Sequence, residues 1–265
     1  MTGRNRIKTM MLGGLLAIAG LGAAEAADLT VGANIGNVPW EFQDASGKTV
    51  GFEVDLVSEI AKRLGKTVEF VNTPFAGLFP AVQSGRINMA VSSITITQKR
   101  LESVSFAQPY YDSDQSLTVT AASGIKGLKD MGGKVVGVDT GSTGDMWADA
   151  HKGDYKLGEI RKFEGLQPAM LDLVAGRVDG YISDIPALLY YVKDKPELKV
   201  VERIPTGEKY SIMFNKGDPL AAQVNDVITT LKKEGFIAKL HQTWFGAKAE
   251  DTTSTVAVLD MPKAK

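Results

Sequence analysis

The feature that most constrains the fold is a weak internal repeat. Residues 30–36, Thr-Val-Gly-Ala-Asn-Ile-Gly, return in similar form as residues 135–141, Val-Val-Gly-Val-Asp-Thr-Gly. Residues 85–93 likewise return as residues 176–184, and in both copies a Gly-Arg pair leads into a strand-like run with a polar end. Two such copies predict two similar lobes. Because ligands of open α/β sheets bind beyond the carboxyl ends of the strands, we expect the four polar strand ends to meet at a binding site.

Strand-like and helical patterns alternate along the first half of the chain. Short apolar runs at residues 29–31, 68–71 and 87–91 have the length and composition of buried strands. Apolar residues recur at helical spacing over residues 57–64, and a second helical stretch covers residues 78–83. Alternation of strands and helices predicts an α/β fold with mostly parallel sheets.

The two lobes are not expected to be simply consecutive. Strand-like runs at residues 116–120 and 210–214 are candidates for two hinge crossings, and the helical pattern over residues 224–236 returns the chain to the first lobe. We therefore predict lobe 1 over residues 27–117 and 211–248, lobe 2 over residues 118–210, and a flexible C-terminal tail over residues 249–265.

The beginning of the chain has the pattern of a secretory signal peptide. Three basic residues lie within the first eight positions, an uncharged apolar run follows over residues 10–23, and small residues surround Ala26. The apolar run is shorter than the roughly 20 residues that span a bilayer. The chain has no cysteine, which excludes disulfides and a lipidated cysteine anchor. We expect residues 1–26 to be cleaved and the mature protein to be free in the periplasm.

Charge and composition argue against several classes of function. The 30 basic and 31 acidic side chains are interspersed, so neither nucleic acid nor a lipid surface is expected as a partner. The two histidines, His151 and His241, lie outside the polar strand ends and have no metal-ligand spacing. No Gly-x-Ser-x-Gly motif or nucleotide-binding glycine loop is present. We predict no catalytic residue, metal or cofactor, although carboxylates in a closed cleft could still perform acid chemistry.

Arg100 is the first candidate for contact with a ligand. Thr97 is placed to cap a helix, and Arg100 then falls in the first turn of that helix. A cation there opposes the helix dipole at a cost of about 0.3–1 kcal/mol, which a bound anion would offset. A carboxylate suits both a guanidinium and helix amides. The alternative is a surface arginine in a solvated first turn.

Asp184 offers the opposite charge from the other copy of the repeat. A carboxylate at this strand end can bind an ammonium group, so Asp184 and Arg100 would together clamp a zwitterion. Alternatively, Asp184 caps the helix that begins near Pro186. The two roles are compatible, because a capping carboxylate retains acceptor sites.

Two further sets of residues remain open on the sequence alone. Residues 139–144, Asp-Thr-Gly-Ser-Thr-Gly, can form either an anion-binding nest or a plain turn between strand and helix. Trp40, Phe75, Tyr110 and Tyr111 are aromatic candidates for covering an apolar part of a ligand, or for the core.

Several segments together resemble the periplasmic polar amino-acid-binding proteins of ABC transporters, solute-binding protein family 3. The segments that carry the resemblance, in chain order, are residues 39–42, 51–56, 93–100, 106–111, 176–179 and 244–245. The resemblance covers essentially the whole mature chain. It implies a two-lobed Venus-flytrap fold of the periplasmic-binding-protein type with two hinge crossings. It also implies a monomer that closes on one amino acid and delivers it to an ABC permease in the inner membrane.

The resemblance also implies roles for individual residues. Arg100 would grip the α-carboxylate, with help from Thr95 and from Ser142 or Thr143. Asp184 and the region of Ser93 would hold the α-amino group. Phe75 would form one aromatic face of the pocket.

Three positions depart from the family pattern. Asn34 stands where an acidic residue is common, and Asn37 stands where an aromatic side chain usually sandwiches the ligand. Asp139 stands where glutamine-binding members tend to carry lysine. These changes favour a ligand with a polar or cationic side chain, and they leave its identity open.

The function that we predict is a non-enzymatic periplasmic receptor for a polar amino acid. One alternative is a cyclohexadienyl dehydratase-like enzyme, since such enzymes resemble this family. The other alternative is a sensor that closes on its ligand and passes the signal to a receptor instead of a permease.

Overall fold

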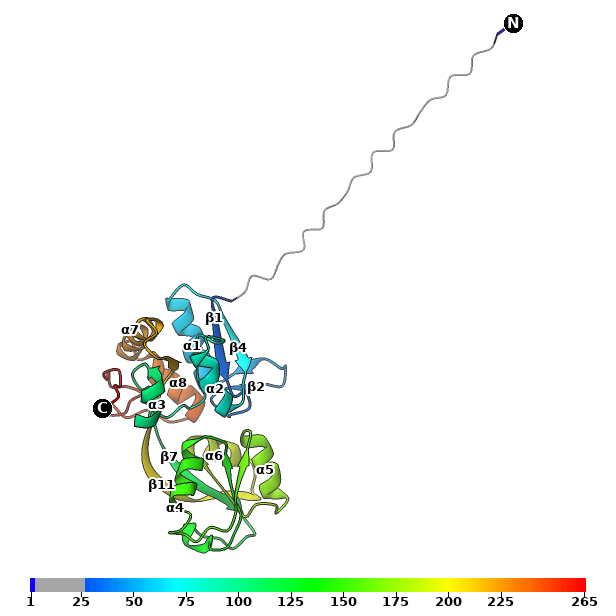
Figure 1. Ribbon diagram of the computed structural model, residues 1–265, viewed down its shortest axis with the longest axis vertical. Helices are drawn as coiled ribbons and strands as arrows, with labels where there is room; N and C mark the ends of the chain where they lie inside the picture. Colours follow the sequence, from blue (N-terminus) through cyan, green and yellow to red (C-terminus); the bar gives the residue numbers. More distant parts are fainter. Residues whose placement is uncertain (3–26) are drawn as a thin grey trace.

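The structure is a computed structural model that describes residues 1–2 and 27–265. The predicted signal peptide, residues 1–26, lies outside the described residues apart from its first two positions. Two lobes make up the described chain, one above the other in Figure 1, and two long strands run between them. In this part of the chain no helix is both long and apolar enough to cross a membrane.

The upper lobe is built on a five-stranded sheet with the order β4-β1-β5-β12-β6. Strand β1 is parallel to both β4 and β5, whereas β12 is antiparallel to its neighbours β5 and β6. The strands of this sheet are β1 (Leu29–Ala33), β4 (Val68–Asn72), β5 (Met89–Ala90), β6 (Val104–Phe106) and β12 (Met213–Asn215). A small hairpin of β2 (Phe42–Gln43) and β3 (Thr49–Val50) lies beside it.

Helices cover both faces of this sheet. Met89 and Phe214 belong to a core formed with α1, α7 and α8, whereas Ala90 and Met213 belong to a core formed with α2 and α3. Neighbouring residues face opposite sides because side chains alternate along a strand. The helices of this lobe are α1 (Phe52–Arg63), α2 (Phe75–Gln83), α3 (Gln98–Ser103), α7 (Leu220–Lys233) and α8 (Phe236–Phe245).

The lower lobe contains a second five-stranded sheet with the order β11-β7-β10-β8-β9. Strand β8 is parallel to β9 and β10, and β10 is antiparallel to β7. The elements of this lobe are β7 (Tyr111–Thr120), a 3₁₀ turn (Leu128–Asp130), β8 (Val136–Asp139), α4 (Thr143–His151), β9 (Ile160–Phe163), α5 (Leu166–Val174), β10 (Gly180–Asp184), α6 (Ile185–Val192) and β11 (Leu198–Tyr210).

The internal repeat corresponds to equivalent pairs of strands. In the upper lobe β1 and β5 are parallel neighbours, with Val31 opposite Met89. In the lower lobe β8 and β10 are also parallel neighbours, with Val136 opposite Gly180. The predicted two-lobed α/β class is therefore confirmed.

The long strands β7 and β11 join the lobes. They pair antiparallel from Leu198 opposite Thr120 to Tyr210 opposite Tyr111, with two irregularities in register. Since each strand begins or ends at the upper lobe and pairs within the lower one, both chain crossings lie side by side. Such a double strand is the natural place for the lobes to rotate about one another.

The C-terminal tail lies against the upper lobe near these strands. Ser254 is fully buried, and its amide donates to Asp112 of β7 at 2.8 Å. The ammonium group of Lys232 on α7 donates to the carbonyl oxygen of Ala257 at 2.8 Å. The flexibility of this tail in solution stays a prediction.

Candidate ligand-binding cleft

A small, partly enclosed cavity lies between the lobes, at the four strand ends that the repeat indicates. Its volume is about 30 Å³, which leaves room for one or two water molecules. An amino acid needs more space, so its entry requires the lobes to part. The residues that line the cavity are Asn34, Asn37, Phe75, Ser92, Ser93, Thr95, Asp139, Ser142, Thr143, Leu166, Ser183 and Asp184.

Nine of the ten residues predicted to bind a ligand are among these, and Arg100 is the exception. Asn34 follows β1 and Ser93 follows β5, while Asp139 and Asp184 end β8 and β10. The cavity therefore brings together residues that are up to 150 positions apart along the chain, counted from Asn34 to Asp184. The backbone of the parallel strands places them at one edge of each sheet.

Arg100 lies directly behind the cavity wall. Its side chain is held between two aromatic rings, with Cζ 5.4 Å from the ring centre of Phe75 and 5.1 Å from that of Phe79. Nη1 donates to the carbonyl oxygen of Thr95 at 2.7 Å, and Nη2 donates across the cleft to that of Gly141 at 3.1 Å. Only 6% of Arg100 is exposed, so it is not a surface arginine in a solvated turn.

The charge of Arg100 is retained at neutral pH without a salt bridge in the described chain. Burial lowers its pKa to about 10, and the nearby carboxylates of Glu208 and Asp184 act in the opposite direction. No carboxylate oxygen of residues 27–265 lies within 4.0 Å of the guanidinium nitrogens. The predicted cap of its helix is confirmed, because the amide of Arg100 donates to Thr97 Oγ1 at 3.1 Å.

Asp184 belongs to the other lobe and lies near enough for its charge to act on Arg100. It stands before the first residue of α6, but its side chain makes no capping hydrogen bond. It accepts instead from Ser93 Oγ of the upper lobe at 3.0 Å and from Gln115 Nε2 at 2.6 Å. Burial and then the charge of Glu208 raise the pKa of Asp184 to about 7. The carboxyl group is therefore directed into the junction of the lobes and not along α6.

Asp139 supplies a second carboxyl group to the cavity. Burial raises its pKa to about 7, and the charge of Glu164 acts in the same direction. The Tyr181 hydroxyl and the Gly165 amide lie near the carboxyl group and partly oppose this rise, but neither makes a well-formed hydrogen bond to the solvent-shielded Oδ1 atom, which has no partner among the residues that the structure describes. A buried acceptor of this kind is costly until a donor reaches it.

Glu208 is a third carboxylate at the site, and it was not predicted from the sequence. It lies on β11 behind the wall and accepts hydrogen bonds from Thr95, Thr143, Gln115 and Thr206. Its single sequence signal was strand alternation, because Glu208 and the fully buried Tyr210 lie two positions apart on the same face.

A pair of buried glutamates supports the turn at Ser92 and Ser93. Ser92 Oγ donates to Glu41 at 2.6 Å, and the amide of Ser93 donates to Glu53 at 2.9 Å. Burial raises the pKa of both glutamates, and the charge of Glu53 raises that of Glu41 further. Ser93 has a φ of 45°, an uncommon backbone conformation that these bonds hold in place.

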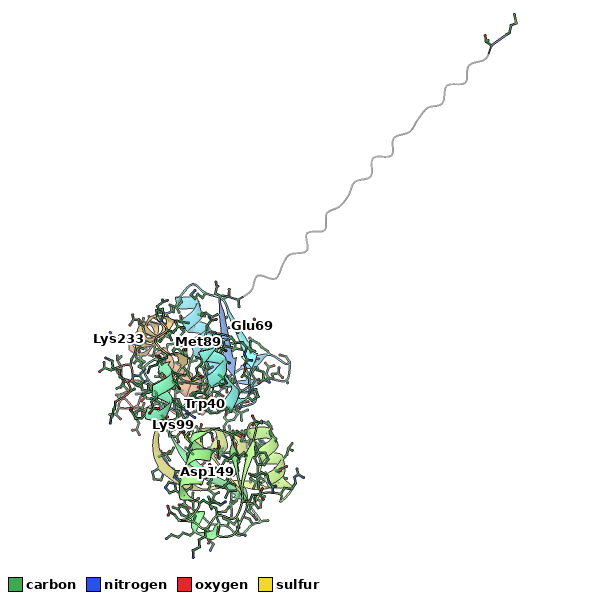
Figure 2. The ribbon with its side chains drawn as sticks, viewed as in Figure 1. Trp40, Glu69, Met89, Lys99, Asp149 and Lys233 are labelled. Atoms are coloured by element: carbon green, nitrogen blue, oxygen red, sulfur yellow. The ribbon has the colours of Figure 1, made fainter. Side chains whose placement is uncertain are left out.

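The aromatic candidates separate into two groups. Trp40 and Tyr110 are fully buried, and Tyr111 is 8% exposed and stacks on Tyr210 in the upper core. The label of Trp40 in Figure 2 lies near the lower end of the upper lobe, above the junction with the second lobe. Only Phe75 among the four lines the cavity. The core alternative is therefore correct for the other three.

The histidines lie away from the cleft. His151 stacks on Trp147 of α4, and His241 stacks on Tyr111. In the described ranges, no group of three or more histidine, cysteine or acidic side chains is arranged to hold a metal ion. The titratable groups of the cleft are consequently carboxylates and one guanidinium, an arrangement that suits a ligand carrying both signs of charge.

Known proteins resemble this chain over most of its length. The probable histidine-binding protein of Neisseria gonorrhoeae is 30% identical over 220 residues, 81% of this chain and 82% of that protein. The L-cystine-binding protein TcyJ of Escherichia coli K12 is 31% identical over 217 residues, 79% of each chain.

Solved structures share the fold. The arginine-, lysine-, histidine-binding protein ArtJ from Geobacillus stearothermophilus matches with a TM-score of 0.78 and 32% identity, over 84% of this chain and 97% of that one. An ancestral amino acid-binding protein, AncCDT-1, described as a precursor of cyclohexadienyl dehydratase, matches with a TM-score of 0.74 and 35% identity, over 82% and 95%. Residues 29–247 match a single family, and the chain therefore belongs to the bacterial extracellular solute-binding proteins, family 3.

Proposed function

We propose that this protein is the solute-binding receptor of an ABC importer, which binds an amino acid between its lobes and delivers it to a membrane permease. The observation that carries the proposal is the buried guanidinium of Arg100, which has no salt-bridge partner in the described chain and reaches Gly141 of the lower lobe, while the carboxyl group of Asp184 lines the same cleft. Two opposite charges at one cleft suit a zwitterion, because each charge of the ligand meets its complement.

Roles for the main groups follow from this arrangement. Arg100 binds the α-carboxylate, together with the first main-chain amides of α4, where the helix dipole favours an anion. Ser142 lies at that helix start and accepts from the amide of Asp145 at 3.0 Å, so its hydroxyl proton is available to the ligand. Asp184 and Ser93 hold the α-amino group. Phe75 lines the pocket between Arg100 and the ligand.

The side chain of the ligand is cationic in this proposal. Asp139 lines the cavity with a buried oxygen that lacks a donor, and the amides of Asn34 and Asn37 are polar neighbours. A guanidinium, ammonium or imidazolium group supplies both the missing donor and the opposite charge. The names of the histidine-binding relative and of ArtJ agree with a basic amino acid, whereas that of TcyJ, an L-cystine-binding protein, makes cystine the rival ligand.

Binding favours the closed arrangement of the lobes. Arg100 reaches Gly141, and Ser93 reaches Asp184, only when the lobes are together. A ligand that contacts both lobes stabilises this state over an open one by the free energy of those contacts. In this proposal the permease recognises the closed form.

The same proposal extends to the mature protein. It is a monomer that diffuses in the periplasm after cleavage of residues 1–26. Residues 27–117 and 211–248 move as one lobe, and residues 118–210 move as the other. Antiparallel pairing of β7 with β11 supports a hinge where both strands meet the upper lobe, near Tyr111 and Tyr210, whereas residues 115–118 pair with β10 of the lower lobe.

A thermal-shift screen of the mature protein tests the function. The ligands are the standard amino acids, ornithine, citrulline, cystine and prephenate. We expect arginine, lysine, ornithine or histidine to raise the melting temperature, because a ligand at 100 times its Kd adds about 2.7 kcal/mol of stability. A shift with cystine alone would contradict the cationic side chain, and no shift with any amino acid would contradict the receptor. Turnover of prephenate would support the dehydratase instead.

A further inference from the structure

Glu208 occupies an unusual place among the carboxylates of the cleft. It lies on the hinge strand β11, is 6% exposed, and does not line the cavity. Its Oε2 accepts from Thr95 Oγ1 of the upper lobe at 2.6 Å and from Thr143 Oγ1 of the lower lobe at 3.0 Å. One carboxylate oxygen therefore takes hydroxyl protons from both walls of the cleft.

The other oxygen of Glu208 is held from the hinge itself. Oε1 accepts from Gln115 Nε2 on β7 at 2.9 Å and from Thr206 Oγ1 on β11 at 3.2 Å. The amide nitrogen of Gln115 has two protons, and its two shortest contacts are with Glu208 and with Asp184 at 2.6 Å. With four donors around it, Glu208 has a fixed orientation relative to both hinge strands.

This arrangement determines the direction of the hydroxyl protons. A threonine hydroxyl has a single proton and two lone pairs. Both Thr95 and Thr143 direct that proton to Glu208. The two hydroxyl oxygens also lie 3.4 Å from each other, but this distance is longer than the distance of either oxygen to Glu208. Gln115 Nε2 also approaches Thr143 Oγ1, at 3.2 Å, and takes up part of its accepting capacity. The remaining lone pairs of both hydroxyl oxygens are left for a ligand, so these two side chains act as acceptors in the cleft.

An acceptor pair distinguishes between the two ends of an amino acid. A ligand carboxylate has no proton to donate, and its oxygens would meet other acceptors. An ammonium group has three donors. Asp184 lies on the same side, because Gln115 bridges it to Glu208.

We infer that Glu208 is a positioning residue that determines ligand specificity: it turns the hydroxyl oxygens of Thr95 and Thr143 into acceptors for the α-ammonium group, beside Asp184. The α-carboxylate is then left to Arg100 and the start of α4. This inference rests on the proposed function. It differs from the roles that the family resemblance implies for Thr95 and Thr143, which place them at the carboxylate.

The Glu208→Gln variant tests the inference through a pair of ligands. L-arginine and its deaminated analogue, 5-guanidinopentanoate, differ only in the α-ammonium group. Glutamine keeps the shape of the side chain, but its amide donates protons and accepts at one oxygen only. We expect titration calorimetry to show about a tenfold loss of affinity for L-arginine and little change for the analogue.

Two variants separate this effect from loss of charge or of fold. Asp139→Asn removes a carboxylate from the part of the cavity that receives the side chain of the ligand. It should therefore lower the affinity for both ligands by the same factor. Glu69→Gln makes the same substitution on the exposed face of β4, far from the cleft, and should change neither affinity. Figure 2 labels Glu69 on the upper lobe, away from the junction.

Thr95→Val provides a second test that does not alter the hinge. It removes one of the two acceptors and should also weaken L-arginine more than the analogue. In the Glu208→Gln background, Thr95→Val should cause a smaller further loss of affinity for L-arginine than it causes alone, because the two side chains act through one hydrogen bond. This variant keeps the inference testable if Glu208→Gln does not fold.

The outcomes separate the inference from the function on which it rests. Unchanged or higher affinity of Glu208→Gln for L-arginine would mean that the hydroxyls donate to the ligand carboxylate, and equal losses for both ligands would mean a general structural role. Either result overturns the inference and leaves the receptor function standing. A wild-type protein that binds no amino acid would contradict the function itself. If the screen identifies another amino acid, the pair is made from that amino acid and its deaminated form.

Discussion

At the scale of single residues, binding depends on a buried charge that lacks an opposite charge at contact distance. Arg100 is held by two carbonyl oxygens and two aromatic rings. Carbonyl groups satisfy hydrogen bonds but do not neutralise the charge, and burial of an unpaired charge is costly. A ligand carboxylate supplies what the site lacks. Asp184 is likewise a buried acid, and a ligand ammonium group supplies the positive charge that it lacks.

Replacement of Arg100 should therefore abolish useful binding. We expect Arg100→Ala to lower the affinity for the amino-acid ligand by at least about 30-fold, since truncating one partner of a buried charged pair costs about 2–5 kcal/mol. Titration calorimetry measures the affinity, and circular dichroism checks that the fold is retained. Lys99→Ala, on an exposed neighbour in the same helix, is the matched control. Wild-type affinity in Arg100→Ala would exclude Arg100 from the site.

Ligand affinity should depend on pH through the two carboxyl groups of the cavity. The pKa values of Asp139 and Asp184 are raised to about 7 in the ligand-free protein, mainly by burial. Each group is protonated below that value and must ionise to bind a cation. Affinity for L-arginine should therefore rise as the pH increases from about 5.5 to about 8.

The stability of the ligand-free protein should change with pH in the opposite direction to the affinity. Carboxyl groups with raised pKa values bind protons more tightly in the folded state than in the unfolded state. Their contribution to stability is full below a pH of about 4 and is lost as the pH rises through about 7. In Asp184→Asn, the affinity for L-arginine and the stability should both lose the part of their pH dependence that comes from Asp184. A pH-independent affinity for L-arginine in the wild type would contradict the roles of both residues.

At the scale of elements, loops and short segments are held by side chains from distant parts of the chain. The Ser92–Ser93 turn is fixed by glutamates that precede and follow the β2–β3 hairpin. The tail after α8 is held in the same way. Ser254 contacts Asp112 on β7, and its hydroxyl accepts from Lys209 on β11 at 2.9 Å. The tail therefore contacts both hinge strands.

Removal of the tail tests how firmly it is docked. A chain that ends at Lys248 loses the carbonyl of Ala257 as a partner of Lys232, whose pKa burial lowers to about 8. It also loses the bonds of Ser254 with the hinge strands. We expect the free energy of unfolding to fall by about 1–3 kcal/mol, measured by urea denaturation. Ser254→Ala should produce part of this loss, and an unchanged midpoint in both would support a flexible tail.

At the scale of the whole molecule, the lobes meet through polar contacts in the cleft and through apolar contacts beside it, where Val38 and Ala187 each pack against the core of the opposite lobe. Arg100 with Gly141, Ser93 with Asp184, and the two threonines on Glu208 connect the lobes. Hydrogen bonds of this kind contribute about 0.5–1.5 kcal/mol each. The covalent connections between the lobes are β7 and β11, and a ligand can shift the balance between open and closed forms.

Small-angle scattering can follow that shift. We expect the radius of gyration to decrease when L-arginine, or the amino acid that the screen identifies, is added to the wild-type protein. Arg100→Ala at the same ligand concentration should retain the ligand-free value. An identical radius with and without ligand in the wild type would contradict closure as the response to binding.

The sequence by itself determined the features that depend on short-range patterns. Alternation of strand and helix predicted the α/β class, the repeat predicted two lobes with four polar strand ends, and Thr97 predicted the start of α3. These rest on local spacing, which needs no knowledge of distant contacts. Arg100 and Asp184 were found in the same way, because each stands at the start of a helix.

Only the tertiary structure decided which distant groups meet. Thr95 and Glu208 are 113 residues apart, and Ser93 and Asp184 are 91 residues apart. Alternation with Tyr210 is the one local signal for Glu208, and it does not show which distant groups the carboxylate meets; nothing in the local pattern around Glu41 separates a buried acid from a solvated one. Packing of two sheets against a shared hinge places these acids behind the cleft. The hydrogen bonds that these acids accept then determine the direction of the hydroxyls in front of them.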